Sequence, residues 1–148
     1  MLNYFRSVFL VIFSFFAISA ATPALSAEPT FAEYKYVLHI SDMDPSKQEL
    51  ILNNAANLLE AYQPGQVEIE IVAYGPGMRL LFAENTHAKR IDSLSQSGVK
   101  FTACGNTIKG MTRQMGEAPK INPTATVVPA SIVRIGELIK QGYIYVKP

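Results

Sequence analysis

The chain has 148 residues, of which 13 are basic and 12 are acidic, and a single cysteine, Cys104. A near-neutral charge without a basic run argues against a nucleic-acid-binding protein, and one cysteine excludes an internal disulfide framework. The length fits one globular domain with a substantial core.

The first predicted element is a secretory signal peptide over residues 1–27. Arg6 is the only charged side chain in this range, the stretch after it has a strongly apolar centre, and small residues follow Pro23. A basic start, an apolar middle and a small-residue end are typical of signal peptides. We expect cleavage after Ala27, or after one of the small residues just before it, and export to the periplasm. The alternative is an uncleaved membrane anchor, against which Pro23 argues.

Strands and helices alternate through residues 28–148, which we expect to form one domain. Runs rich in β-branched and aromatic residues predict five strands, at 34–40, 67–73, 99–103, 125–128 and 143–146. The spacing of apolar residues predicts helical segments at 47–62, 78–83, 88–96, 106–115 and 132–139. Such alternation indicates a parallel sheet with helices on both faces, which is an α/β fold.

Local signals refine three of these helices. Asp44 is a good N-cap for the first helix, with Pro45 at its first position, and Ser131 can cap the last one. The apolar residues of segment 78–83 fit either a core or a subunit interface. The inward face of the first helix is expected to carry Leu50, Ile51, Ala55, Leu58 and Leu59.

The turns that follow the parallel strands are where we expect a functional site. Right-handed crossovers would bring the carboxyl ends of these strands to one edge of the sheet. Four turns should therefore meet there, at 39–42, 74–77, 103–107 and 129–131. Open α/β sheets bind their ligands at this edge.

Cys104 lies in one of these turns, between a predicted strand and a predicted helix. The free N–H groups and the positive dipole at a helix start stabilise a thiolate, which is the reactive form of cysteine. Cys104 is therefore a candidate nucleophile, and the backbone of Gly105, Asn106 and Thr107 is expected to surround its sulfur. The alternative is a small, inert core residue, which is the commoner role of a lone buried cysteine.

Three residues of the neighbouring turn, Tyr74, Gly75 and Gly77, are candidate binding residues. The two glycines fit a simple chain reversal, or a close backbone wall beside the thiol. They do not complete a dinucleotide-binding loop, because Leu80 occupies the place of the third glycine.

His39 ends the first predicted strand at the same edge, and it is a candidate base for Cys104. A histidine that is simply hydrogen-bonded within the fold is the alternative. No spacing of histidine, cysteine and carboxylate residues matches a metal site, so we expect no metal and no cofactor.

Segments 74–77, 99–107 and 133–148 together resemble the DsrE/DsrF-like family, and most closely its exported branch. The resemblance covers nearly all of residues 33–148. It implies a three-layer α/β/α sandwich with a mainly parallel sheet of about five strands, assembled into homo-oligomers that are often trimers or hexamers. The best-studied members are cytoplasmic sulfur-relay proteins that carry sulfur as a cysteine persulfide, and Cys104 matches their cysteine at the strand-to-helix turn.

The leading functional prediction is therefore a periplasmic sulfur carrier or sulfurtransferase that holds a persulfide on Cys104. Its partners would be a sulfane-sulfur donor and an acceptor thiol, without nucleic acid and without a stable membrane anchor after cleavage. The alternative is a non-catalytic oligomeric binding or assembly protein in which Cys104 is inert. A flavin- or nucleotide-dependent enzyme has no supporting motif.

Overall fold

The computed structural model describes residues 32–148, so the predicted signal peptide lies outside the described residues. The strands are β1 (Tyr34–Ile40), β2 (Val67–Ala73), β3 (Lys100–Cys104), β4 (Ala125–Val128) and β5 (Ile144–Val146). The helices are α1 (Pro45–Ala61), the 3-10 helix η1 (Gly75–Leu81), α2 (Ala88–Gln96), α3 (Gly105–Met115) and α4 (Ser131–Lys140). Each predicted strand and helix is present, with small shifts at several ends.

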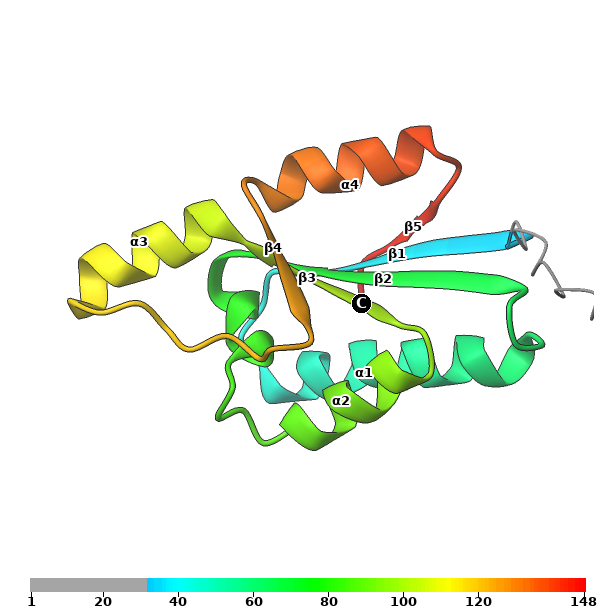
Figure 1. The fold of residues 1–148 in the computed structure, drawn as a ribbon, viewed down its shortest axis with the longest axis horizontal. Helices are drawn as coiled ribbons and strands as arrows, with labels where there is room; N and C mark the ends of the chain where they lie inside the picture. The colour runs from blue at the N-terminus through cyan, green and yellow to red at the C-terminus, as the bar shows by residue number, and fades with distance from the viewer. Residues whose placement is uncertain (1–31) are drawn as a thin grey trace, which may run out of the picture.

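The strands form one parallel sheet in the order β4-β3-β2-β1-β5. The chain builds this sheet outward from β1 to β4 and then returns over one face to place β5 at the other edge. Figure 1 shows α4 on that face and α1 with α2 on the opposite face. The predicted α/β fold with a parallel sheet of five strands is confirmed.

The main hydrophobic core lies between the sheet and the layer formed by α1, α2 and η1. Burying one leucine or isoleucine side chain stabilises a fold by about 1.5–3 kcal/mol, so this layer dominates the packing. The η1 residues Met78, Leu80 and Leu81 are fully buried, which assigns them to the core and not to a subunit interface. The other large, fully buried side chains include Leu38, Ile51, Leu52, Ile69, Ile71, Ile91 and Phe101.

The inward face of α1 differs from the prediction by a small rotation. Leu50 is 45% exposed, and the buried residues are Gln48, Ile51, Leu52 and Ala55. A glutamine is tolerated inside because its amide donates to the Met43 carbonyl and accepts from another side-chain amide. The predicted start of α1 is confirmed, since the carboxylate of Asp44 accepts a hydrogen bond from the N–H of Ser46 at 2.8 Å.

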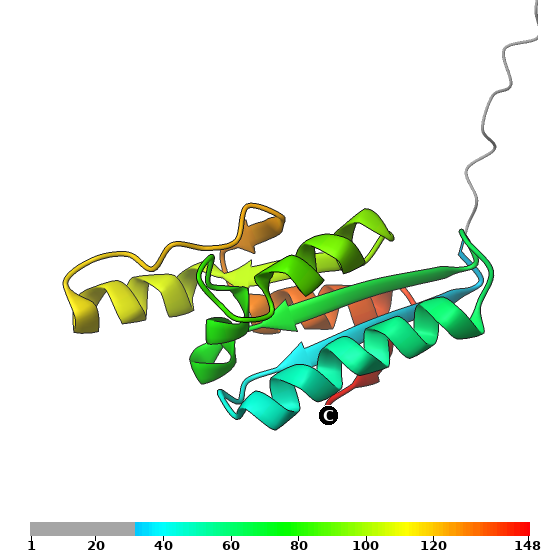
Figure 2. The same ribbon diagram turned by 90° about the horizontal axis from the view of Figure 1, so that it is seen from below.

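The last two helices have unusual positions. In Figure 2, α3 extends beyond the arrowhead end of β1 and β2, and none of its residues is buried. The helix α4 packs against β1, β2 and β3 and is capped by Ala130, so the prediction that Ser131 caps it is wrong. Ser131 is instead its first residue.

No helix within residues 32–148 has the length and apolar character needed to cross a membrane.

Candidate functional site

The four turns predicted to converge do meet at the carboxyl edge of the sheet. Backbone and side-chain hydrogen bonds connect each turn to at least one of the others. They run from Tyr74 N to Ile40 O (3.2 Å), Gly77 N to Ser41 O (3.0 Å), Gly75 N to Thr107 Oγ1 (3.0 Å), Asn106 N to Pro129 O (3.1 Å) and Ser131 N to Cys104 Sγ (3.5 Å). This network makes one continuous rim from turns that are far apart in the chain.

Cys104 lies at the junction of two helices in this rim. It is the N-cap residue of α3, with extended backbone, and its sulfur accepts a hydrogen bond from the first amide of α4, that of Ser131. The starts of α3 and α4, each the positive dipole end of its helix, therefore both lie beside this sulfur atom. Only 6% of Cys104 is exposed, so these dipoles act in a poorly hydrated place.

The surroundings of the sulfur change its ionisation in two opposing ways. Burial raises the pKa of the Cys104 thiol, because the charged thiolate loses water. Hydrogen bonds from the backbone amide of Ser131, and from the hydroxyl and backbone of Thr107, lower it, and the lowering effects together outweigh the burial. The net pKa of Cys104 is below the ordinary value for a thiol, which favours the reactive thiolate.

Glycine at position 105 permits the close contact between the start of α3 and the turn before α4. A Cβ atom there would lie 3.1 Å from the Val128 carbonyl oxygen, tighter than most Cβ contacts. The amide of Asn106 donates to the Pro129 carbonyl and is thus engaged with the backbone of this turn. Of the three residues expected around the sulfur, Thr107 therefore acts on it most directly.

Glycine is required at positions 75 and 77 of the neighbouring turn for two different structural reasons. Gly75 has a φ of +52°, a backbone conformation that favours glycine, and its N–H donates to the hydroxyl oxygen of Thr107. Gly77 packs so closely on the first turn that a Cβ would lie 2.6 Å from the Ile40 carbonyl oxygen. Gly75 is thus explained by its backbone conformation and Gly77 by a close backbone contact, and Gly75 also donates a hydrogen bond to Thr107.

His39 is 4% exposed and has partners of its own. Its Nδ1 shares a hydrogen bond with the Tyr145 hydroxyl at 2.7 Å, and its ring stacks on Tyr74 at 4.6 Å between centroids. Within residues 32–148, His39 Nε2 is the buried side-chain nitrogen that lacks a hydrogen-bond partner. Burial and Lys147 lower the pKa of His39, whereas Asp42 opposes them, so a neutral ring is favoured.

An open groove lies against the Thr107 side of the rim. Its volume is about 370 Å³, and both Gly75 and Thr107 line it together with the cation Arg79. In the described part of the chain, no group of three or more histidine, cysteine or acidic side chains is gathered as metal ligands would be.

A model of the DsrE/DsrF-like family matches residues 35–148. The chain belongs to this family. Comparison with curated proteins finds no match. Among solved structures, the chain is similar to a protein of unknown function, MTH1491, from Methanobacterium thermoautotrophicum. The sequences are 29% identical, the TM-score is 0.69, and the match covers 78% of this chain and 99% of that one.

Within this DsrE/DsrF-like domain, sequence reasoning missed the contribution of Ser131. It was predicted to cap α4 with its hydroxyl, yet its amide contacts Cys104 and its hydroxyl donates to the Ala73 carbonyl at 3.2 Å. The expected convergence of turns 103–107 and 129–131 was the signal that could have found it.

Proposed function

We propose that this DsrE/DsrF-like protein is a sulfur carrier that holds a persulfide on Cys104. The family generally consists of sulfur-relay proteins. The observation that carries the proposal is the hydrogen bond from the first amide of α4 to the sulfur of a cysteine that itself begins α3. Two helix starts at one sulfur favour a thiolate, and they also favour the negative charge of a bound persulfide.

The chemistry is two successive exchanges at sulfur. The Cys104 thiolate attacks the outer sulfur of a donor persulfide, R–S–SH, forming Cys104–S–SH and releasing the thiolate R–S⁻. An acceptor thiolate then attacks the outer sulfur of Cys104–S–SH and restores the Cys104 thiolate. With thiosulfate as the donor, the leaving group is sulfite. Each step transfers one sulfur atom without an added oxidant or reductant.

The low exposure of Cys104 shapes how a donor must approach. Because Cys104 is only 6% exposed, a large donor has little direct access to its sulfur. The groove lined by Gly75, Thr107 and Arg79 lies beside this point, and its cation favours an anionic donor. A sheltered sulfur also protects a persulfide from loss to other thiols.

Export to the periplasm is part of the proposal. The basic start, the apolar middle and the small-residue end of residues 1–27 support it. The mass of the chain recovered from a periplasmic extract tests both the export and cleavage after Ala27.

Assembly into a homo-oligomer, a trimer or a hexamer, is proposed as well. Exposed apolar side chains support it, among them Ile132 of α4 at 64% and Ile144 of β5 at 51%. Sedimentation equilibrium of the mature chain would measure the assembly directly.

The second candidate is a non-catalytic binding or assembly protein. Its support is the same low exposure of Cys104, which also fits a packing residue. Thiol alkylation separates the two functions: fast labelling of the folded protein at neutral pH is expected for a carrier. Labelling that begins only after denaturation would favour the binding protein.

A further inference from the structure

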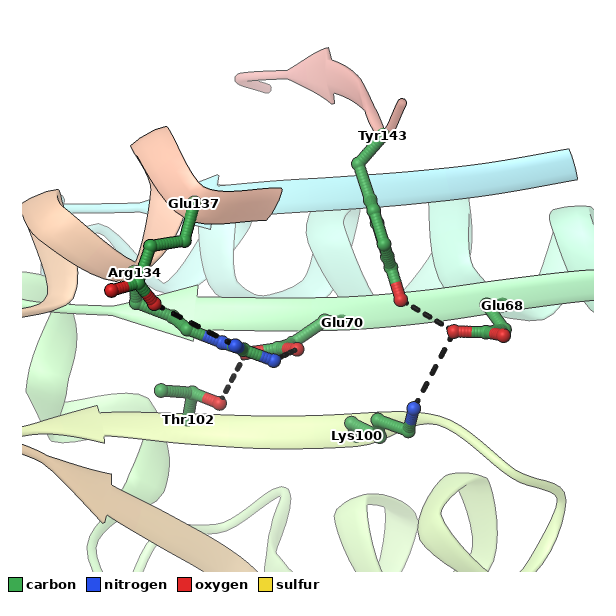
Figure 3. Close-up of polar contacts among 7 residues, drawn as sticks. All are labelled: Glu68, Glu70, Lys100, Thr102, Arg134, Glu137 and Tyr143. Carbon is green, nitrogen blue, oxygen red and sulfur yellow. Dashed lines mark hydrogen bonds and ion pairs between the residues drawn. The ribbon is translucent and has the colours of Figure 1, made fainter. Parts of the chain in front are cut away.

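A carboxylate in the middle of the sheet, Glu70, is almost completely buried. It is 1% exposed, and it accepts hydrogen bonds from Thr102 Oγ1 at 2.7 Å, Arg134 Nε at 2.9 Å and Arg134 Nη2 at 2.8 Å. Figure 3 shows the carboxylate of β2 between the threonine of β3 and the arginine of α4. A buried carboxylate is costly unless it is paired and fully hydrogen-bonded, which is the case here.

The two partners of Glu70 belong to the two elements that meet at the thiol. Thr102 precedes Cys104 by two residues in the same strand, β3. Arg134 follows Ser131 by three residues, within the first turn of α4. Glu70 is therefore bonded to the strand that ends in the cysteine and to the helix whose first amide contacts its sulfur.

We propose that Glu70 is a positioning residue, which holds the start of α4 against β3 so that the Ser131 amide stays within hydrogen-bond distance of Cys104 Sγ. The bidentate pair with Arg134 fixes the rotation of α4 as well as its distance from the sheet. The Ser131 hydroxyl, bonded to the Ala73 carbonyl, holds the same turn to β2. The inference rests on the proposed role of Cys104 as a reactive thiol.

Stability alone is a weak explanation for this ion pair. Replacing a buried ion pair by well-packed apolar side chains is often neutral or stabilising, so a fold does not need one at the centre of its sheet. What the pair adds is a defined geometry between β3 and α4. That geometry determines whether the amide of Ser131 can reach the sulfur.

The charge of Glu70 also acts on the thiol directly. Removing this charge changes the pKa of Cys104 in the opposite direction to the loss of the Ser131 hydrogen bond. The Glu70 carboxylate bonds to Thr102, which is two residues before Cys104 and thus about 7 Å from it along the strand. Removing this negative charge would by itself lower the pKa of Cys104. Loss of the Ser131 hydrogen bond would raise it.

A matched control exists on the same strand. Glu68 lies two residues before Glu70 on the same face, and it also bonds to β3, through Lys100, and to the segment after α4, through Tyr143 (Figure 3). These contacts are at the end of α4 that is remote from Ser131. Glu68→Gln therefore removes a similar carboxylate without affecting the site.

The experiment is a pH titration of the thiolate by its ultraviolet absorbance, with the spectrum of Cys104→Ser subtracted at each pH. Glu70→Gln is expected to raise the pKa of Cys104 by about half a unit or more, the scale of one lost helix-terminus interaction. Arg134→Lys is expected to do the same, because lysine keeps the positive charge but cannot form the bidentate pair with Glu70. Glu68→Gln is expected to leave the pKa unchanged.

An unchanged or lowered pKa in the folded Glu70→Gln and Arg134→Lys variants would overturn the proposal, as would an equal rise in Glu68→Gln. If Glu70→Gln does not fold, Arg134→Lys decides alone, because the Arg134 side chain is 30% exposed and a change there is better tolerated. The titration uses no sulfur donor, so it tests the positioning role of Glu70 and not persulfide transfer. A negative result would therefore leave the persulfide-carrier proposal to its own test.

Discussion

The backbone N–H of Ser131 lies 3.5 Å from Cys104 Sγ, although 27 residues separate the two in the chain. The contact exists because β4 pairs with β3 and the turn after β4 packs closely on Gly105. Glycine has no side chain that would keep the two segments apart. A second helix start thereby reaches a cysteine that already begins a helix. The arrangement lowers the pKa of the thiol despite its burial.

Loss of the Thr107 hydroxyl is predicted to raise the pKa of Cys104. This hydroxyl accepts from the N–H of Gly75 at 3.0 Å and, as a donor, lowers the pKa of the thiol. Thr107→Val keeps the shape of the side chain but cannot donate, so alkylation of Cys104 should require higher pH. The measurement is the alkylation rate as a function of pH. Thr107→Ser, which keeps the hydroxyl, should resemble the wild type, and identical profiles for both variants would contradict the prediction.

Gly77→Ala is predicted to destabilise the fold by about 1–3 kcal/mol, the usual cost of overpacking. The added Cβ would lie 2.6 Å from the Ile40 carbonyl oxygen and 2.8 Å from Ser41 Cα, and backbone atoms in a sheet edge cannot move away cheaply. Urea denaturation measures the loss. The control is Gly136→Ala in α4, where no atom lies within 4 Å and helix propensity predicts a gain of about 1 kcal/mol. Equal stability of the two variants would show that the contact at Gly77 is not tight.

Stability is predicted to fall as the pH is lowered through the range where an unfolded histidine takes up a proton. Burial and Lys147 lower the pKa of His39 in the folded state, with Asp42 opposing. The unfolded chain therefore binds more protons below about pH 6.5, so the stabilising effect of the neutral ring is present above that pH and is lost below it. The free energy of unfolding, measured from about pH 7 to about pH 5, should decrease.

His39→Gln isolates this effect because it keeps a hydrogen-bonding group opposite Tyr145 without a titrating ring. The variant should show a flatter dependence of the free energy of unfolding on pH. A wild-type slope in His39→Gln would assign the pH dependence to other groups.

The order of elements was predictable from the sequence because the local patterns are strong. Segments 88–96 and 125–128 have the predicted bounds, since residues of clear helical or strand character fill them between turn residues. The convergence of four turns followed from the handedness of parallel crossovers, and the hydrogen bonds confirm it. The prediction that Leu50 lies on the buried face of α1 was wrong. Hydropathy alone could not reveal that Gln48 would be buried there with its amide hydrogen-bonded.

The polar contacts of the site were beyond the reach of sequence patterns. Glu70 and Arg134 are 64 residues apart, and alternation along β2 made Glu70 resemble an exposed strand residue. It is buried because α4 crosses that face of the sheet, which depends on the position of β5 at the far edge. Cys104 was predictable as a candidate because a strand-to-helix junction is visible locally. Ser131 was not predictable as its partner, because a backbone amide has no side-chain signature.

Intact-mass analysis of the mature chain, before and after incubation with a persulfide or thiosulfate donor, tests the central claim most directly. We predict a gain of one sulfur atom that reductant removes, and no gain in Cys104→Ser, which should keep the wild-type circular dichroism spectrum. An unchanged mass, with Cys104 unreactive until the protein is denatured, would contradict the sulfur carrier and favour the binding or assembly protein.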